Sequence, residues 1–169
     1  MSPDKKLDQV GELLINACRR DVGVLSGSFL CQSLSSLNPR VPLCVSTDTK
    51  VEKVLEILRD NKIGCVCVTD QSNKLVGIFS ERDCLIKITS KFNSALNEPI
   101  ECYMTKDPVT QTSDGTIAFT LTLMSEGGFR HLPVVDESGS PVGMISIKDV
   151  IDAIVSRFFS DLEAMTNIG

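Results

Sequence analysis

The sequence of 169 residues contains no tryptophan, one tyrosine and one histidine. A serine hydrolase would need His131 as its base, and no Gly-x-Ser-x-Gly turn is present to carry the nucleophile. The Walker A lysine loop, the Gly-x-Gly-x-x-Gly turn and the His-Glu-x-x-His helix are also absent. These absences argue against a catalytic function.

Long apolar runs and an excess of basic residues are lacking as well. No apolar stretch reaches the roughly 20 residues of a membrane-spanning helix, and the charged opening MSPDKKLDQVGELL does not fit a secretion signal. The formal net charge of −5 argues against a nucleic-acid surface, which needs a basic stripe to face the phosphates. We therefore expect a cytoplasmic protein that binds neither a membrane nor nucleic acid.

The seven cysteines form no Cys-x-x-Cys pair and show no zinc spacing, and their odd number fits a reducing compartment. Cys65 and Cys67 alternate along an apolar stretch, so they share one face of a predicted strand. We expect both to be small core residues, and a metal or redox role is the alternative.

What the sequence does contain is an internal repeat. A shift of 66 residues aligns 42–88 with 108–154 without a gap, and 11 of the 47 pairs are identical. The stretch GIFSERD (77–83) corresponds to GMISIKD (143–149). Two copies indicate a paired module rather than a solenoid, which normally needs three or more repeats for stability.

Each copy predicts the order strand, helix, strand, strand, helix. In the first copy Val51, Val54 and Leu58 fall on one apolar stripe of a helix. Two apolar strands follow, joined by the acidic turn DQSN, and DESG takes its place in the second copy. Residues 89–99 form the linker between the copies. Near the N-terminus, LDQVGELLINAC (7–18) predicts a further helix with one apolar face.

The gapless pair resembles tandem cystathionine β-synthase (CBS) domains, the arrangement called a Bateman module, because each copy ends in Gly, two hydrophobic residues, Ser, two further residues and Asp. The resemblance implies an α/β fold of two βαββα units related by a pseudo-twofold axis, preceded by an N-terminal helix. It divides the chain into an N-terminal helix and connector (1–33), a first CBS domain (34–93), a second CBS domain (94–160) and a C-terminal tail (161–169). The second copy also has the family's usual entry, MTKDPVT, which ends in Thr110 where the first copy has Cys44.

The Ser-x-x-Asp motif carries the expected ligand chemistry. A helix that begins at Ser80 or Ser146 presents unpaired N–H groups, and the carboxylate of Asp83 or Asp149 one turn later can accept two hydrogen bonds from a ribose diol. In the CBS family the matching Asp binds ribose, and the matching Ser or Thr assists it or contacts a phosphate. The alternative is a capping box, in which Ser and Asp only close the start of the helix.

Four basic residues near the motifs are candidates for phosphate contact. Arg130 and His131 begin a strand of the second copy where the first copy is neutral, and the family often places Arg or His there. Arg82 and Lys148 directly precede the motif aspartates. The alternatives are a solvated rim for Arg130, a satisfied edge residue for His131, and a solvated helix face for Arg82 and Lys148. Arg130 could also serve a nucleotide whose ribose is held by Asp83.

The resemblance implies a regulatory or sensor protein that binds an adenosyl ligand in the cleft between the two CBS units, with the second copy as the stronger site. AMP, ADP, ATP and S-adenosylmethionine are the candidates, and no obligatory cofactor or metal is implied. The alternatives are a ligand-free scaffold acting by protein–protein contact and, third, an enzyme working through its cysteines. The helix expected at 148–162 is apolar around much of its surface, which predicts a homodimer; any regulated target would be a separate protein.

Overall fold

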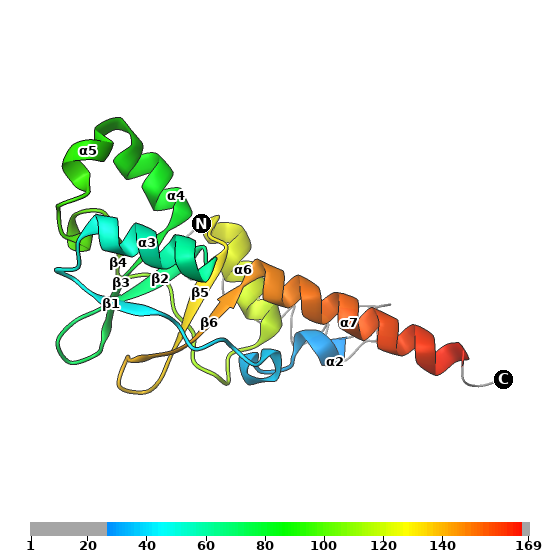
Figure 1. Cartoon of the computed structure of the whole chain (residues 1–169). Coiled ribbons are helices and arrows are strands. Elements are labelled where there is room, and N and C mark those ends of the chain that lie inside the picture. Colours follow the sequence, from blue (N-terminus) through cyan, green and yellow to red (C-terminus); the bar gives the residue numbers. More distant parts are fainter. Residues whose placement is uncertain (1–26, 167–169) are drawn as a thin grey trace, which may run out of the picture. The chain divides into compact units, whose positions relative to one another are not determined.

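The computed structural model describes residues 27–166, with side chains described through Arg157. The helix expected at 7–18 lies outside this part. The described chain forms two compact units: a helical unit of 27–39, 113–132 and 145–166, and a sheet unit of 40–112 and 133–144. The fold is mixed α/β as expected (Figure 1). Within this part, no helix is both long and apolar enough to cross a membrane.

The sheet unit contains four hydrogen-bonded strands in the order β1-β2-β3-β4. They are β1 (Cys44–Ser46), β2 (Cys65–Thr69), β3 (Leu75–Ser80) and β4 (Thr105–Lys106). Strand β1 runs parallel to β2, whereas β2 and β3 form the predicted antiparallel hairpin and β4 is antiparallel to β3 (Figure 1). The chain that leads into the second repeat therefore completes the sheet of the first.

Helix α3 (Val51–Asn61) buries the predicted apolar stripe against this sheet. Val51 and Val54 are fully buried, and Leu58 is nearly so. They belong to the same core cluster as Val66 and Val68 of β2. All five residues of β2 are buried, including Cys65 and Cys67. The expectation that these two cysteines are core residues is therefore confirmed.

The linker is more structured than a plain connection. It contains the short helices η3 (Thr89–Lys91) and α5 (Phe92–Ala95). Its carbonyl groups then accept the first free N–H groups of α3: Glu98 accepts from Val51, and Leu96 from Glu52, both at 3.0 Å. Because the residue before α3 provides no side-chain cap, these carbonyls satisfy donors that a helix start leaves unpaired.

The second repeat follows the predicted order from its helix onward. Its elements are α6 (Ile117–Gly127), β5 (His131–Val135), β6 (Pro141–Ser146) and α7 (Ile147–Thr166). Its expected first strand is reduced to a bridge between Gln111 and Val134. In the first repeat the N–H of Cys67 donates to the Leu43 carbonyl at 2.9 Å. Pro133 takes the place of Cys67 and has no N–H, so the parallel pairing does not extend.

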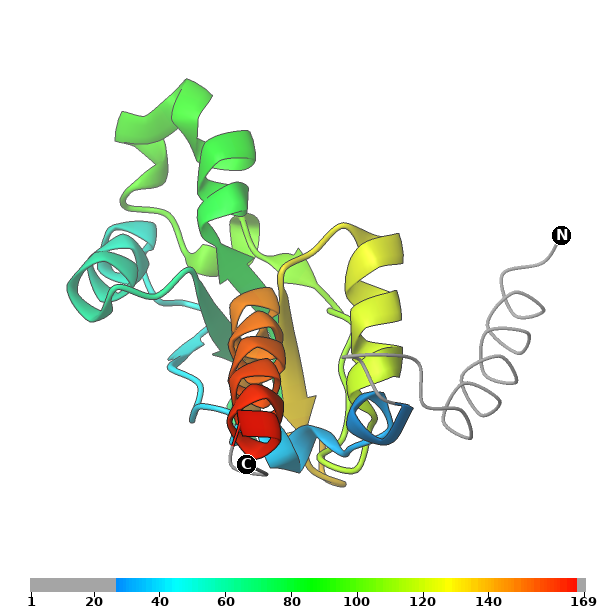
Figure 2. The same cartoon turned by 90° about the vertical axis from the view of Figure 1, so that its right-hand side faces the viewer.

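In the helical unit, the chain that precedes the first repeat packs on the second. It forms α2 (Gly27–Leu30) and the 3-10 turn η1 (Leu34–Leu37). Leu34 is fully buried, and its N–H donates to the Gly115 carbonyl at 2.7 Å. Figure 2 shows α2, in blue, beside the start of α6, and the two helices are in contact. Residues 27–39, which precede the first repeat, are thus part of the same compact unit as helix α6 of the second repeat.

Gly77 lies on β3 opposite Lys106 of β4, where the two backbones approach closely. A Cβ atom at position 77 would lie 2.9 Å from Cγ of Met104 and 3.1 Å from the Thr105 carbonyl oxygen. Both distances are shorter than ordinary van der Waals contact. The glycine of the first motif is therefore needed for the approach of β4.

We expect Gly77→Ala to lower the free energy of unfolding by about 1–3 kcal/mol, because the added methyl group pushes β4 away from β3. Urea denaturation followed by circular dichroism measures the change. Ser72→Ala, in the exposed turn of the same hairpin, is the control and should stay within about 0.5 kcal/mol of the wild type. A Gly77→Ala variant as stable as this control would contradict the packing argument.

Candidate functional site

The two Ser-x-x-Asp motifs form the same three hydrogen bonds. The Ser80 hydroxyl and N–H donate to Oδ2 of Asp83 at 2.7 and 2.9 Å, and the Asp83 N–H donates to the Ser80 oxygen at 3.4 Å. The corresponding distances between Ser146 and Asp149 are 2.6, 2.7 and 3.2 Å. Each serine gives its only hydroxyl hydrogen to the carboxylate. Each serine therefore closes the start of its helix and orients the aspartate, which is the geometry of a capping box.

The helices that follow the two motifs differ. In the first repeat, α4 (Glu81–Asp83) has three residues and continues as the π-helical turn η2 (Cys84–Ile88). In the second repeat, α7 runs for 20 residues. A positive N-terminal end arises from aligned peptide dipoles over a regular helix. The second motif therefore begins a long regular helix, whereas the first begins a single α-helical turn that continues as a π-helix.

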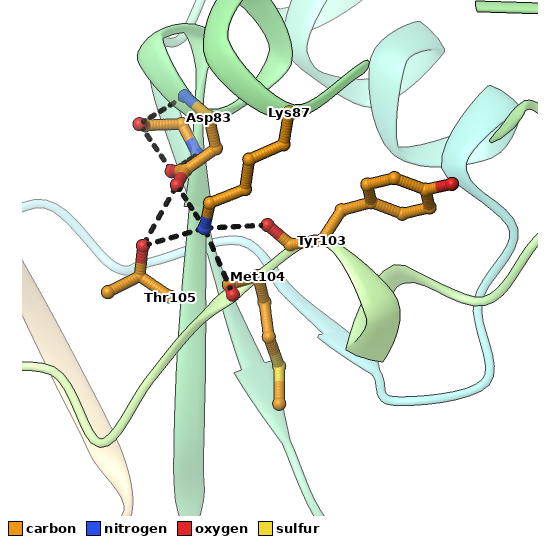
Figure 3. Close-up of polar contacts among 6 residues, drawn as sticks. Asp83, Lys87, Tyr103, Met104 and Thr105 are labelled. Carbon is orange, nitrogen blue, oxygen red and sulfur yellow. Dashed lines mark hydrogen bonds and ion pairs between the residues drawn. The ribbon is translucent and has the colours of Figure 1, made fainter. Parts of the chain in front are cut away.

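A lysine and a threonine that sequence reasoning did not select complete the first site. Lys87 Nζ lies 2.7 Å from Oδ1 of Asp83, and the Thr105 hydroxyl donates to the same oxygen at 2.8 Å (Figure 3). Lys87 also donates to the carbonyls of Tyr103 at 2.9 Å and Met104 at 3.2 Å, and to the Thr105 hydroxyl oxygen at 3.2 Å. The spacing of four residues between Asp83 and Lys87 was a usable signal. Thr105 reaches Asp83 because β4 pairs with β3, and no pattern in the neighbouring sequence predicts this contact.

The surroundings of Asp83 keep its carboxyl group ionised. Burial raises the pKa of Asp83, but hydrogen bonds from Lys87, Ser80 and Thr105 outweigh this effect and hold the pKa below its ordinary value. The side chain of Asp83 is 11% exposed and that of Lys87 is 35% exposed. The pair is therefore a largely desolvated ion pair with supporting hydrogen bonds.

The segment that supplies the carbonyls around Lys87 is itself anchored. The Tyr103 hydroxyl donates to Glu98 at 2.5 Å, and this bond raises the pKa of Tyr103 to about 12. Lys91 Nζ lies 5.8 Å from the centre of the Tyr103 ring, within the range of a cation–π contact. Tyr103 is buried, so its backbone is fixed where Lys87 binds it.

The structure brings Arg130 to the second motif. Its carbonyl accepts the N–H of Ile147, the residue after Ser146, at 2.9 Å, as the Gly64 carbonyl accepts from Glu81 in the first repeat. The side chain of Arg130 is exposed. Arg130 and Gly64, which the repeat alignment pairs, thus make the same backbone hydrogen bond in the two repeats.

The other predicted site residues have varied surroundings. His131 is half-buried at the start of β5, and Thr110 is half-buried in the sheet unit. Arg82 is exposed. Lys148 is exposed and forms an ion pair with Asp152 one turn along α7, which favours the solvated-face interpretation for this lysine. Among the described side chains of residues 27–157, no three His, Cys, Asp or Glu residues are grouped as metal ligands.

Comparison with known proteins identifies the family. The CBS domain profile matches residues 35–90 and 100–156. The chain belongs to the CBS domain family. It is 33% identical over 111 residues to an uncharacterised 17.7 kDa protein of Acidianus ambivalens, covering 66% of each chain. It is also 31% identical over 111 residues to the inosine-5'-monophosphate dehydrogenase of Aquifex aeolicus, covering 65% of this chain and 22% of that protein. The chain thus spans less than two thirds of the length of these CBS relatives.

Solved structures of CBS proteins share the fold. The CBS-domain protein ATU1752 of Agrobacterium tumefaciens superposes with a TM-score of 0.66 at 31% identity, covering 73% of this chain and 94% of that one. The CBS protein PAE2072 of Pyrobaculum aerophilum, complexed with AMP, gives 0.66 at 24% identity and covers 76% and 98%. The CBS pair of MJ0100, in complex with 5'-methylthioadenosine and S-adenosylmethionine, gives 0.66 at 21% identity and covers 75% and 98%.

The lowered pKa of Asp83 predicts a specific dependence of stability on pH. The ion pair stabilises the fold fully above the ordinary aspartate pKa of about 3.9, and this stabilisation is lost as the pH falls through the lower pKa of the folded state. We expect Asp83→Asn to be less stable than the wild type at pH 7 and to lose less stability in acid. Urea denaturation between pH 7 and pH 3 tests this.

Asp60→Asn, an exposed position at the end of α3, is the control and should keep the wild-type acid dependence. Equal acid dependence in Asp83→Asn and the wild type would show that Asp83 contributes nothing to it.

Proposed function

We propose that this CBS-pair chain is a regulatory or sensor protein that binds an adenine nucleotide or another adenosyl ligand through its second repeat. The observation that carries the proposal is the geometry of Asp149. Ser146 orients its carboxylate at the start of the 20-residue helix α7, beside the backbone of Arg130. A carboxylate in this place can accept both hydroxyls of a ribose diol. CBS proteins of the same fold carry AMP or S-adenosylmethionine.

The residues of the second repeat have different proposed roles in binding the ligand. Asp149 takes the ribose, and Ser146 holds Asp149 in position. Arg130 has an exposed guanidinium group that can make charge-assisted hydrogen bonds to a phosphate, and His131 follows it on β5. Lys148 is the weaker candidate for phosphate because its ammonium group is paired with Asp152. AMP, ADP, ATP and S-adenosylmethionine all present the required adenosyl group.

The function is tested by isothermal titration and thermal shift with AMP, adenosine, S-adenosylmethionine and GMP. We expect AMP and S-adenosylmethionine, and not GMP, to raise the melting temperature; at 100 times its Kd a ligand adds about 2.7 kcal/mol of stability. Asp149→Asn should weaken AMP binding roughly ten- to hundredfold, the value of a charge-assisted hydrogen bond. Arg130→Gly should weaken AMP more than adenosine.

Glu137→Gln, exposed in the turn between β5 and β6, is the control and should bind AMP like the wild type. No response to any adenosyl ligand at millimolar concentration would favour the ligand-free scaffold instead.

We also propose that the chain forms a homodimer through α7. One face of this helix is used internally, since Val150 is fully buried. Ile151 and Val155, four residues apart on another face, remain 51% and 46% exposed. Two apolar side chains at this spacing form a stripe suited to a second helix, and a second copy of the chain supplies an identical stripe. Phe158, Phe159 and Leu162, on which the expectation also drew, lie beyond the described side chains.

We expect the wild type to sediment as a dimer at tens of micromolar protein and the double variant Ile151→Lys, Val155→Lys to sediment as a monomer, because buried ammonium groups oppose association. Val41→Lys is the control, since Val41 is an apolar residue that is 86% exposed in the sheet unit. A monomeric wild type, or a double variant that remains dimeric, would contradict the assignment of the interface to α7.

A further inference from the structure

The carboxylate of Asp83 has its hydrogen-bonding capacity filled from within the chain. Oδ2 accepts two hydrogen bonds from Ser80, and Oδ1 accepts one from Thr105 and contacts the Lys87 ammonium. A carboxylate offers about four lone-pair directions. A ribose diol that approached Asp83 would therefore have to replace donors that are already in place.

The donors on Oδ1 are hard to replace. Lys87 has four acceptors within 3.2 Å, one more than the three hydrogens of an ammonium group: Asp83, the carbonyls of Tyr103 and Met104, and the Thr105 hydroxyl (Figure 3). Removing Lys87 would leave a largely buried carboxylate and two carbonyls without their partner. Hydrogen bonds to an ionised donor are roughly twice as strong as those between neutral groups, and a ribose hydroxyl is neutral. The internal lysine should prevail over the diol.

The two repeats differ at this position. Residue 153 corresponds to Lys87 when the repeats are aligned, and it is alanine. A methyl group cannot donate a hydrogen bond to Asp149. The serine and aspartate of both motifs are identical, so the lysine is a specific difference between the two aspartates.

We infer that Lys87 acts as a built-in occupant of the first Ser–Asp motif and closes Asp83 to ribose. This inference concerns the choice of site and rests on the proposed adenosyl function. It assigns to Lys87 the role of a specificity-determining residue: the lysine, and not the motif, decides whether the first repeat can take the ligand. Substituting the lysine with an uncharged residue of similar length should open the first motif.

The test is isothermal titration with AMP of the full chain, the wild type, Asp83→Asn and Lys87→Met. We expect Asp83→Asn to change AMP affinity by less than about twofold, because Asp83 and the occupied site are independent. Lys87→Met should gain an added AMP-binding event that disappears in the double variant Asp83→Asn, Lys87→Met. The gained event should prefer AMP over 2'-deoxy-AMP by at least about tenfold, since a site that binds a hydroxyl rejects an analogue without it. Lys74→Met, an exposed lysine in the β2–β3 turn, is the control and should gain nothing.

Several outcomes would overturn the inference. A Lys87→Met variant that folds and gains no Asp83-dependent event shows that the lysine does not close the site. If Lys87→Met does not fold, the Asp83→Asn variant decides, because a loss of AMP affinity of about tenfold or more with Lys87 in place shows that Asp83 already holds the ligand. A wild type that binds neither AMP nor S-adenosylmethionine contradicts the proposed function alone. A gain of AMP binding in Lys87→Met would still support the inference, and no gain would overturn it.

Discussion

The first sheet depends on one carboxylate that joins three segments of the chain. Asp83 closes the end of β3 through Ser80, holds η2 through Lys87 and fixes β4 through Thr105. Strand β4 has only two residues and few ladder bonds of its own. The contacts of Asp83 stabilise this short edge strand in addition to its few backbone hydrogen bonds. The absence of a side chain at Gly77 leaves room for β4 beside β3. The position of β4, which follows the linker, is thus fixed by side-chain contacts of Asp83 as well as by backbone pairing with β3.

Local patterns in the sequence predicted the elements whose causes are local. The apolar spacing of Val51, Val54 and Leu58 predicted α3, and the acidic turn DQSN predicted the hairpin of β2 and β3. The missing strand at Gln111 was also readable in principle, since Pro133 stands where Cys67 donates a bond. The alignment counted that pair only as a mismatch of two apolar residues, and the loss of an N–H group is not visible in hydrophobicity.

The surroundings of Asp83 could not be predicted in the same way. Two of the four acceptors of Lys87 are backbone carbonyls, at Tyr103 and Met104, which any residue type would provide. They reach the lysine because the linker folds back on α3 and β4 pairs with β3, and both events depend on contacts between distant parts of the chain. The sequence offered only the spacing of Asp83 and Lys87, which on a helix most often marks an exposed pair of modest value.

The two motifs have the same folding role. The hydrogen bonds between serine and aspartate are the same in both repeats, and they satisfy backbone donors at a helix start whether or not a ligand is present. A Ser-x-x-Asp pair can therefore be kept in a repeat for its cap alone. In the first repeat the outer carboxylate oxygen contacts an ammonium group from the same chain, and this contact is the basis for inferring that the first motif is a cap and not a ligand site.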